Sequence, residues 1–295
     1  MGLGRTLVLG FIAGATIVLG LPVGRLRRPA PGLRAVLNAT AVGVLLFLVW
    51  DVLTHAWEPI DAALGAVRDG GGSTSAVLGY GALFVGGLGA GLLSLVAYEG
   101  WIGRVTARAA LSPSANAPAG LRVEMSERRR PTGVASWSVA RRLALLIAVG
   151  IGLHNFAEGL AIGQSAARGE IALATLLVVG FALHNATEGF GITAPLAGDL
   201  DPDGSPRRPS WAFLLGLGLI GGGPTFLGAA VGHGFTSEPL SIVFLTLAAG
   251  SILYVVTQLL GVAARAKRPD LLAYGLLLGM VAGFATDAIV TAGGA

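Results

Sequence analysis

The sequence predicts an all-α, polytopic membrane protein with eight transmembrane helices and both termini outside. Three observations support this prediction: the composition, the length of the apolar stretches and the distribution of Lys and Arg. Hydrophobic residues make up 54% of the 295 residues and charged residues make up 12%, and the mean hydropathy is +0.75. A soluble domain carries roughly a quarter charged residues, so this composition excludes an ordinary soluble protein.

Eight stretches are apolar and long enough to cross a bilayer, which takes about 20 residues for about 30 Å of hydrocarbon. The second stretch is the least regular, because Asp51, His55 and Glu58 crowd its C-terminal end. We interpret the chain, 1–295, as a single transmembrane domain. The stretches lie near 3–22, 35–56, 76–98, 141–165, 170–194, 210–233, 239–263 and 269–291.

The connections between these stretches differ in charge. Those after the first, third, fifth and seventh stretches hold all but three of the 20 Lys and Arg residues, the exceptions being Arg5, Arg68 and Arg168. By the positive-inside rule the basic side is cytoplasmic, so both termini lie outside, which requires an even number of helices. A cleaved signal peptide is the alternative, but it would leave seven helices and turn the basic cluster 25–34 outward.

The basic residues also bear on partners. The sequence pI of about 10.1 would by itself suit a nucleic-acid partner. The basic residues instead lie in short segments between apolar stretches, as membrane topology requires, so we expect no nucleic-acid partner. The longest connection, 100–140, contains Pro113, Pro118 and several Ser and Ala residues, and we expect a flexible cytoplasmic loop there.

The next cytoplasmic connection holds Asp199, Asp201 and Asp203. Their spacing weakly resembles that of a calcium-binding loop. The neighbouring Pro202 and Pro206 favour a solvated turn instead, and we interpret the segment in that way.

One motif occurs twice within apolar surroundings: Leu-His-Asn-x-x-Glu-Gly runs from Leu153 to Gly159 and again from Leu183 to Gly189. Each copy places His and Glu at i and i+4, on one face of a helix. An imidazole and a carboxylate one turn apart form half of a divalent-metal site. Two copies on adjacent antiparallel helices, near mid-membrane, could supply both halves. We expect the two glycines to permit close helix contact.

The candidate ligands share nitrogen or oxygen donors, which the absence of cysteine requires of any metal site in this chain. Imidazoles favour zinc, iron, cobalt, nickel or cadmium over calcium or magnesium. Ionisable groups at that depth cost roughly 2.5–3.5 kcal/mol each, which a bound cation would offset. The alternative is that the polar side chains pair with one another and join two helices. The candidates are His154, Asn155, Glu158, His184, Asn185 and Glu188.

The two stretches His154–Gly159 and His184–Gly189 resemble the ZIP (Zrt/Irt-like protein) family of divalent metal transporters, especially its bacterial members. Those carry His-Asn-x-Pro-Glu-Gly in the fourth and fifth transmembrane helices. Eight helices, outward termini and a long loop after the third helix also match, so the resemblance implies a ZIP-like helix bundle. It further implies that His154, Glu158 and Glu188 coordinate the main ion with His184 beside them, and that Asn155 and Asn185 contribute to a second, adjacent ion.

The end of the second stretch, with His55 and Glu58, resembles the family's His-x-x-Pro-Glu element at the outer mouth. With Asp51, these residues are candidates for an entrance to the pathway, as is Gln258 further along it. The alternative for this cluster is a cap at the membrane interface.

Three departures from the family pattern stand out. Ala157 and Thr187 replace the proline before each Glu. Gly223 stands before Pro224 where the family often has Glu-Pro, and Gln258 stands where the seventh helix often has Glu. We infer that a second metal position is weak or absent.

The motif and the resemblance together predict a secondary transporter that imports a divalent transition-metal ion into the cytoplasm. Zinc is the first candidate, followed by iron, manganese and cadmium. The metal is then a substrate, and we expect no prosthetic cofactor. No G-x-x-x-x-G-K motif is present, so ATP is not expected to drive transport.

The expected partners are the metal ion and the lipid bilayer, with a homodimer as a candidate assembly, and the expected location is the bacterial plasma (inner) membrane. Two alternatives use the same residues: a metal-binding membrane regulator and an intramembrane metal-dependent enzyme. Membrane di-iron oxidases usually need many histidines, and this chain has four.

Overall fold

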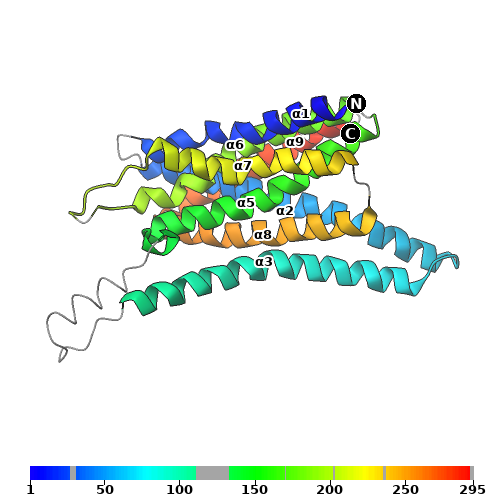
Figure 1. Cartoon of the computed structure of the whole chain (residues 1–295), viewed down its shortest axis with the longest axis horizontal. Helices are drawn as coiled ribbons and strands as arrows, with labels where there is room; N and C mark the ends of the chain where they lie inside the picture. The colour runs from blue at the N-terminus through cyan, green and yellow to red at the C-terminus, as the bar shows by residue number, and fades with distance from the viewer. Residues whose placement is uncertain (27–30, 111–132, 170, 202, 235–236, 293–295) are drawn as a thin grey trace.

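The computed structural model describes residues 1–26, 31–110, 133–169, 171–201, 203–234 and 237–292. Within these ranges the secondary structure is helical, apart from one isolated bridge between Leu200 and Pro206. The helices run along one another in a single bundle (Figure 1), which confirms the all-α fold class. They are α1 (Leu3–Ala15), α2 (Pro31–Arg68), α3 (Thr74–Ala110), α5 (Val139–Ala167), α6 (Ile171–Thr193), α7 (Trp211–Gly234), α8 (Glu238–Arg265) and α9 (Pro269–Ala292).

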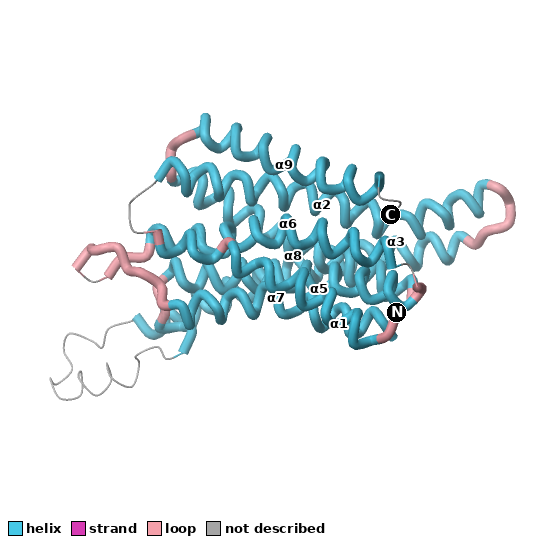
Figure 2. The backbone as a smooth tube through the Cα atoms, turned by 90° about the horizontal axis from the view of Figure 1, so that it is seen from above, coloured by secondary structure: helices cyan, strands magenta, loops and turns pink. Residues whose placement is uncertain are grey.

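The helices have the dimensions of membrane spans. Among the described residues, seven helical segments are long and apolar enough to cross a bilayer. The remaining helix, α6, has 23 residues, which at 1.5 Å per residue is about 35 Å, and it runs inside the same bundle (Figures 1 and 2). The protein is therefore a multi-pass membrane protein. The loop expected over 100–140 begins within α3 and lies largely outside the described residues.

The first span is not one regular helix. After α1, the chain continues as two 3-10 turns, η1 (Thr16–Leu19) and η2 (Leu21–Arg25). A run of β-branched residues favours this change, and Pro22, inside η2, cannot donate a backbone hydrogen bond. The hydroxyl of Thr16 donates to the carbonyl of Ala13 at 2.6 Å, which holds the end of α1 in place.

α2 and α3 extend beyond the stretches that the hydropathy pattern suggested. α2 continues through Pro59 to Arg68, and its 38 residues span about 57 Å, nearly twice the hydrocarbon thickness. Gly70, with a φ of +82°, lies in the turn that leads back into α3. The hairpin formed by the two helices projects past the rest of the bundle (Figures 1 and 2).

The two ends of the bundle differ. α1 begins and α9 ends at the same end, the one from which the hairpin projects (Figure 1); we call it the terminal end. The opposite end holds the start of α5 with Arg141 and Arg142 and the end of α8 with Arg265; we call it the basic end. An even number of spans places the two ends of the chain together in this way.

The connection between α6 and α7, at the basic end, is held by a buried ion pair. The side chain of Asp199, expected in a solvated turn, is 1% exposed, and its Oδ2 lies 3.0 Å from Nε of Arg141 in α5. Arg207 pairs with Asp201 in the same connection, but those two side chains are 36% and 38% exposed. Asp199 therefore ties the end of α6 to the start of α5, the two helices that carry the repeated motif.

We expect Arg141→Ala to destabilise the protein by about 3 kcal/mol, because it leaves the buried Asp199 carboxylate without its charged partner. Thermal unfolding of the purified protein in detergent measures the effect. Arg207→Ala is the matched control, since an exposed pair contributes less than about 1 kcal/mol. Equal melting temperatures for the two variants would contradict the structural role of Asp199.

Candidate metal centre

The two copies of the motif meet at one depth in the bundle. α5 and α6 continue as helices through Ala157 and Thr187, the positions where a proline would be expected. Measured along the helices, His154 lies roughly 20 Å from the end of α5, and His184 lies roughly 20 Å from the start of α6. Both of these helix ends lie at the terminal end of the bundle. The hydroxyl of Thr187 donates to the carbonyl of His184 at 2.7 Å. The helices thus present both histidines near the middle of the bundle.

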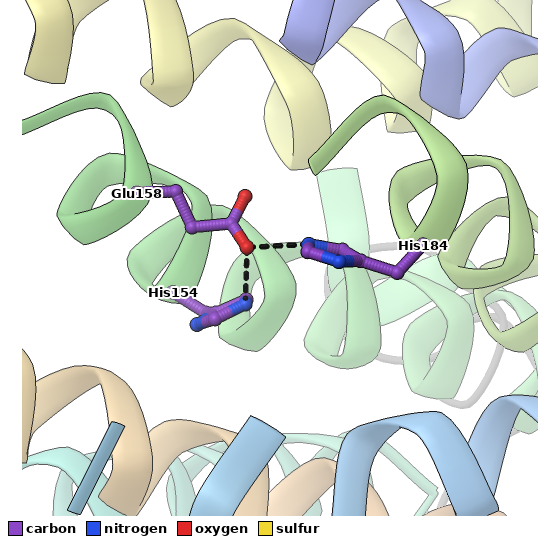
Figure 3. Close-up of side chains that lie close together, drawn as sticks. All are labelled: His154, Glu158 and His184. Atoms are coloured by element: carbon purple, nitrogen blue, oxygen red, sulfur yellow. Dashed lines mark hydrogen bonds and ion pairs between the residues drawn. The ribbon is translucent and has the colours of Figure 1, made fainter. Parts of the chain in front are cut away.

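Three of the candidate ligands form a cluster around one carboxylate oxygen. Nε2 of His184 lies 2.5 Å from Oε1 of Glu158, and Nε2 of His154 lies 3.0 Å from the same oxygen. Figure 3 shows both rings turned toward the carboxylate. All three side chains are buried, and their ligand atoms lie within 4.8 Å of one another. Contacts of this kind bring ligands from two helices to one point.

Glu188 faces the same point from α6. Its Oε1 lies 3.9 Å from Nε2 of His154. Its Oε2 accepts a hydrogen bond from Nδ2 of Asn155 at 3.1 Å, and the same amide donates to the carbonyl of Gly221 in α7 at 2.9 Å. Asn155 therefore orients Glu188 and links it to α7.

Asn185 makes a different contact. Its Nδ2 donates to the carbonyl of Ala13 at 3.0 Å, at the point where α1 ends. A second close approach lies one turn further along α6, where Gly189 packs on η1 and a Cβ would strike the carbonyl of Ile17. Gly159 packs in the same way on the carbonyl of Thr225 in α7. Both motif glycines thus permit close helix contact, as predicted.

Several buried nitrogen and oxygen atoms at this centre have no hydrogen-bond partner among the described residues. They are Oε2 of Glu158, Oε1 of Glu188, the amide oxygen of Asn155 and Nδ1 of His154. A buried polar atom left unpaired costs about 1–3 kcal/mol. A cation bound between these side chains would supply the missing partner for the acceptors, so the donor set fits a metal ion.

The distances suit such an ion after a small adjustment. Two ligand atoms that each lie about 2.1 Å from a tetrahedral ion are about 3.4 Å apart. The nitrogen–oxygen distances in the cluster are 2.5 and 3.0 Å, so the side chains need to separate by less than about 1 Å. Imidazole and carboxylate donors together suit zinc and neighbouring transition metals.

A cavity of about 380 Å³ connects the cluster to the surface. His154, Glu158 and His184 line its inner end, and residues of α2 together with residues nearer the terminal end of α5, α6, α8 and α9 line the remainder. Asp51 and His55 of α2 also line it, and the side chain of His55 is 58% exposed. The cavity therefore opens toward the terminal end.

Between the cluster and the basic end, the interior of the bundle is filled by apolar side chains. Ile151 lies one turn from His154 on α5, and Ile192 lies one turn from Glu188 on α6; both are fully buried. They belong to a core cluster that includes Leu45 and Leu259. Access to the centre in this conformation is thus from one side.

The remaining entrance candidates differ in position. Asp51 and His55 line the cavity, with Nδ1 of His55 3.5 Å from Oδ1 of Asp51. Glu58 is exposed on α2 and does not line it. Gln258 also lies outside the cavity lining and donates to Oε2 of Glu99 at 3.3 Å, at the contact of α8 with α3.

Two cavity residues carry little signal in the sequence. Asp287 of α9 and Gln164 of α5 line the cavity, although each has only one neighbouring polar residue, Thr286 or Ser165, in an otherwise apolar stretch. Gly223, the position matched to a family glutamate, faces away from the centre, because a Cβ there would meet the side chain of Leu219 in its own helix and nothing else within 4 Å.

Comparison with known proteins identifies one family. The family model described as ZIP Zinc transporter matches residues 113–291, which is more than half of the chain and includes α5 to α9 with the whole cluster. A search of curated proteins found no match. The matched region does not include α2 with Asp51 and His55.

We expect Glu158→Gln to weaken metal binding at least about 100-fold, because it removes the one carboxylate that both imidazoles contact, and losing even an outer-shell partner costs 10- to 100-fold. Titration of the purified protein with Zn²⁺ measures this affinity. Glu238→Gln, an exposed carboxylate at the start of α8, is the matched control and should bind as the parent does. Parent-like binding by Glu158→Gln would remove this cluster as the metal centre.

Proposed function

Because the chain belongs to the ZIP zinc transporter family, we propose that it imports a divalent transition-metal ion into the cytoplasm through the centre between α5 and α6. Zinc is the proposed main substrate, with iron, manganese and cadmium as further candidates. The observation that carries the proposal is a buried His/Glu cluster with unpaired acceptor atoms at the inner end of a cavity.

The proposed ligands are His154, Glu158, His184 and Glu188. Glu158 contacts both imidazoles, so it is the ligand common to both helices. Glu188 supplies the second negative charge, which makes the site neutral with a 2+ ion. Asn155 holds Glu188 in place, and its amide oxygen is available as a further, weak ligand.

We propose one main metal position. Asn185 directs its amide nitrogen to the end of α1, and Gly223 offers no donor and faces away from the centre. The absence of a donor at Gly223 argues against a strong second position on the α7 side.

The proposed direction is inward. The positive-inside rule assigns the basic end to the cytoplasm, and the cavity opens toward the opposite end. The ion would therefore enter from outside and reach the cluster directly. Leaving to the cytoplasm requires the apolar side chains around Ile151 and Ile192 to separate, so transport proceeds through a change of conformation.

The driving force does not require a nucleotide. A membrane potential favours the entry of a 2+ ion by about 4.6 kcal/mol per 100 mV, twice the value for a single charge. We place the protein in the bacterial plasma membrane, with a homodimer as the proposed assembly. The metal is the substrate, and no prosthetic cofactor or enzymatic turnover is part of this proposal.

Proteoliposomes with an inside-negative potential test the proposal. We expect accumulation of Zn²⁺, and we expect Glu188→Gln to reduce the uptake rate at least about tenfold, because the site then binds a dication with one carboxylate fewer. Glu238→Gln should transport at the parent rate, and protein-free liposomes give the background.

The same assay separates the alternatives. A regulator would bind Zn²⁺ in the titration above and show no uptake beyond the background. Uptake that is equal in the parent and in Glu188→Gln would leave transport standing and remove the site. An enzyme would convert an organic substrate without moving the ion.

A further inference from the structure

α2 and α6 lie side by side and run in opposite directions, and their interface holds a space at each of two levels. At the level of the centre, Leu48 of α2 and His184 of α6 both line the cavity. Nearer the basic end, Asn38 of α2 and Thr193 of α6 line a second space of about 10 Å³. At the rise of an α-helix, the two levels are about 14 Å apart. The second space therefore lies on the basic side of the centre, along the same interface.

The layer that separates the two spaces is thin and contains small residues. A Cβ added to Gly191 of α6 would lie 3.7 Å from Cβ of Ala41 of α2 and 3.2 Å from Cδ1 of Leu259 of α8. Glu188, which faces the centre, precedes Thr193 by about 7.5 Å along α6. The closed layer between the proposed ion and the second space is thus less than two helical turns thick.

Oxygen atoms that could contact a passing cation line the second space. The amide oxygen of Asn38 has no hydrogen-bond partner among the described residues, although the residue is only 3% exposed. The hydroxyl of Thr193 donates to the carbonyl of Gly189 at 3.1 Å, so the lone pairs of its oxygen remain to accept. A space of this size holds about one water. Arg34 also lines it, and its positive charge disfavours a resting dication, so the space suits passage and not storage.

Other helix contacts on the basic side are joined by polar groups. Arg141 and Asp199 join α5 to the end of α6. Ser251 of α8 donates to the carbonyl of Gly150 of α5 at 2.9 Å, and Asn38 donates to a backbone carbonyl of α8 at 3.1 Å. Within the described parts of α2 and α6, no hydrogen bond or ion pair connects these two helices. Their interface can therefore separate without breaking a polar contact.

We propose that the ion leaves the centre between α2 and α6 and reaches the cytoplasm past the oxygens of Asn38 and Thr193. This inference rests on the proposed function, because it assigns the inner half of the same path. When the interface parts at Ala41 and Gly191, the second space joins the centre, and the two oxygens contact the ion as it leaves Glu188. Neither Asn38 nor Thr193 belongs to the metal centre, so changing them slows release without weakening the binding of zinc.

A disulfide across the interface tests whether the interface must open. The chain has no cysteine, so within one chain a pair introduced as Ala41→Cys and Gly191→Cys can bond only with each other. The 3.7 Å between their Cβ positions fits a disulfide. We expect oxidation to lower Zn²⁺ uptake by proteoliposomes at least about tenfold, because the conformational step is blocked. Reduction with a phosphine should restore uptake, and the zinc affinity should not change. Each single variant, under the same oxidant, is a matched control and should transport at its unoxidised rate.

Thr193→Val and Thr193→Ser test the route itself. Valine keeps the shape of threonine and removes the hydroxyl, whereas serine keeps the hydroxyl. We expect Thr193→Val to lower the uptake rate at least about threefold, as the loss of one polar contact would, and Thr193→Ser to restore most of that rate. Both variants should bind Zn²⁺ with the parent affinity in the titration, since Thr193 lies outside the centre.

The outcomes separate this inference from the proposed function. Absence of uptake by the parent would contradict the proposed function. With uptake by the parent, equal rates for the oxidised and reduced cysteine pair, or failure of the pair to form the disulfide, would overturn the exit between α2 and α6. Parent-rate uptake by Thr193→Val would also remove the route, even where the reduced cysteine pair is itself inactive, and would leave the metal centre in place.

Discussion

The carboxylate of Glu158, shared by imidazoles from two antiparallel helices, is the interaction on which the centre depends. Its Oε1 contacts His154 on the same helix and His184 on α6. Ionisable groups at mid-bilayer depth are costly unless they meet one another or a cation. Here they do meet, yet the second oxygen of the carboxylate has no partner among the described residues. The contact lowers the cost of burying these side chains, and the unpaired second oxygen leaves the centre able to accept an ion.

Close packing around α6 makes that contact possible. Gly189 lets η1 approach α6, and Asn185 binds the last turn of α1. At the basic end, Asp199 and Arg141 join the end of α6 to the start of α5. The helices that carry the candidate ligands, α5 and α6, are therefore connected to one another both at the centre and at the basic end, which fixes the relative positions of those side chains.

The surroundings of the centre are asymmetric, and this matters for transport. A cavity lined by Asp51, His55 and Asp287 lies on one side. Buried isoleucines and leucines fill the other side. The proposed ion site at Glu158 is thus open toward the terminal end and closed toward the basic end. A site open on one side at a time is the condition for moving an ion without a continuous pore.

Much of this architecture was predictable from the sequence because a bilayer imposes simple rules. Apolar length indicates where the chain crosses the membrane, and i, i+4 spacing places His and Glu on one helix face. The repeat predicted that two such faces meet, and the structure brings His154, Glu158 and His184 together. The glycines of the motif were likewise interpretable, since a missing side chain is useful where two backbones approach.

The features that sequence could not determine depend on neighbours distant in the chain. The sequence suggested a solvated turn at Asp199. In the structure, Asp199 is instead buried in an ion pair with Arg141, 58 positions away. Asn155 and Asn185 look equivalent in the repeat, but one orients Glu188 and the other binds Ala13. The sequence by itself determined the helices and the two turns that carry the candidate ligands, because these are local properties of hydropathy and helical periodicity. Tertiary structure alone decided which side of the centre is open and which residues line it, because a cavity is formed by side chains of several helices packed at one depth.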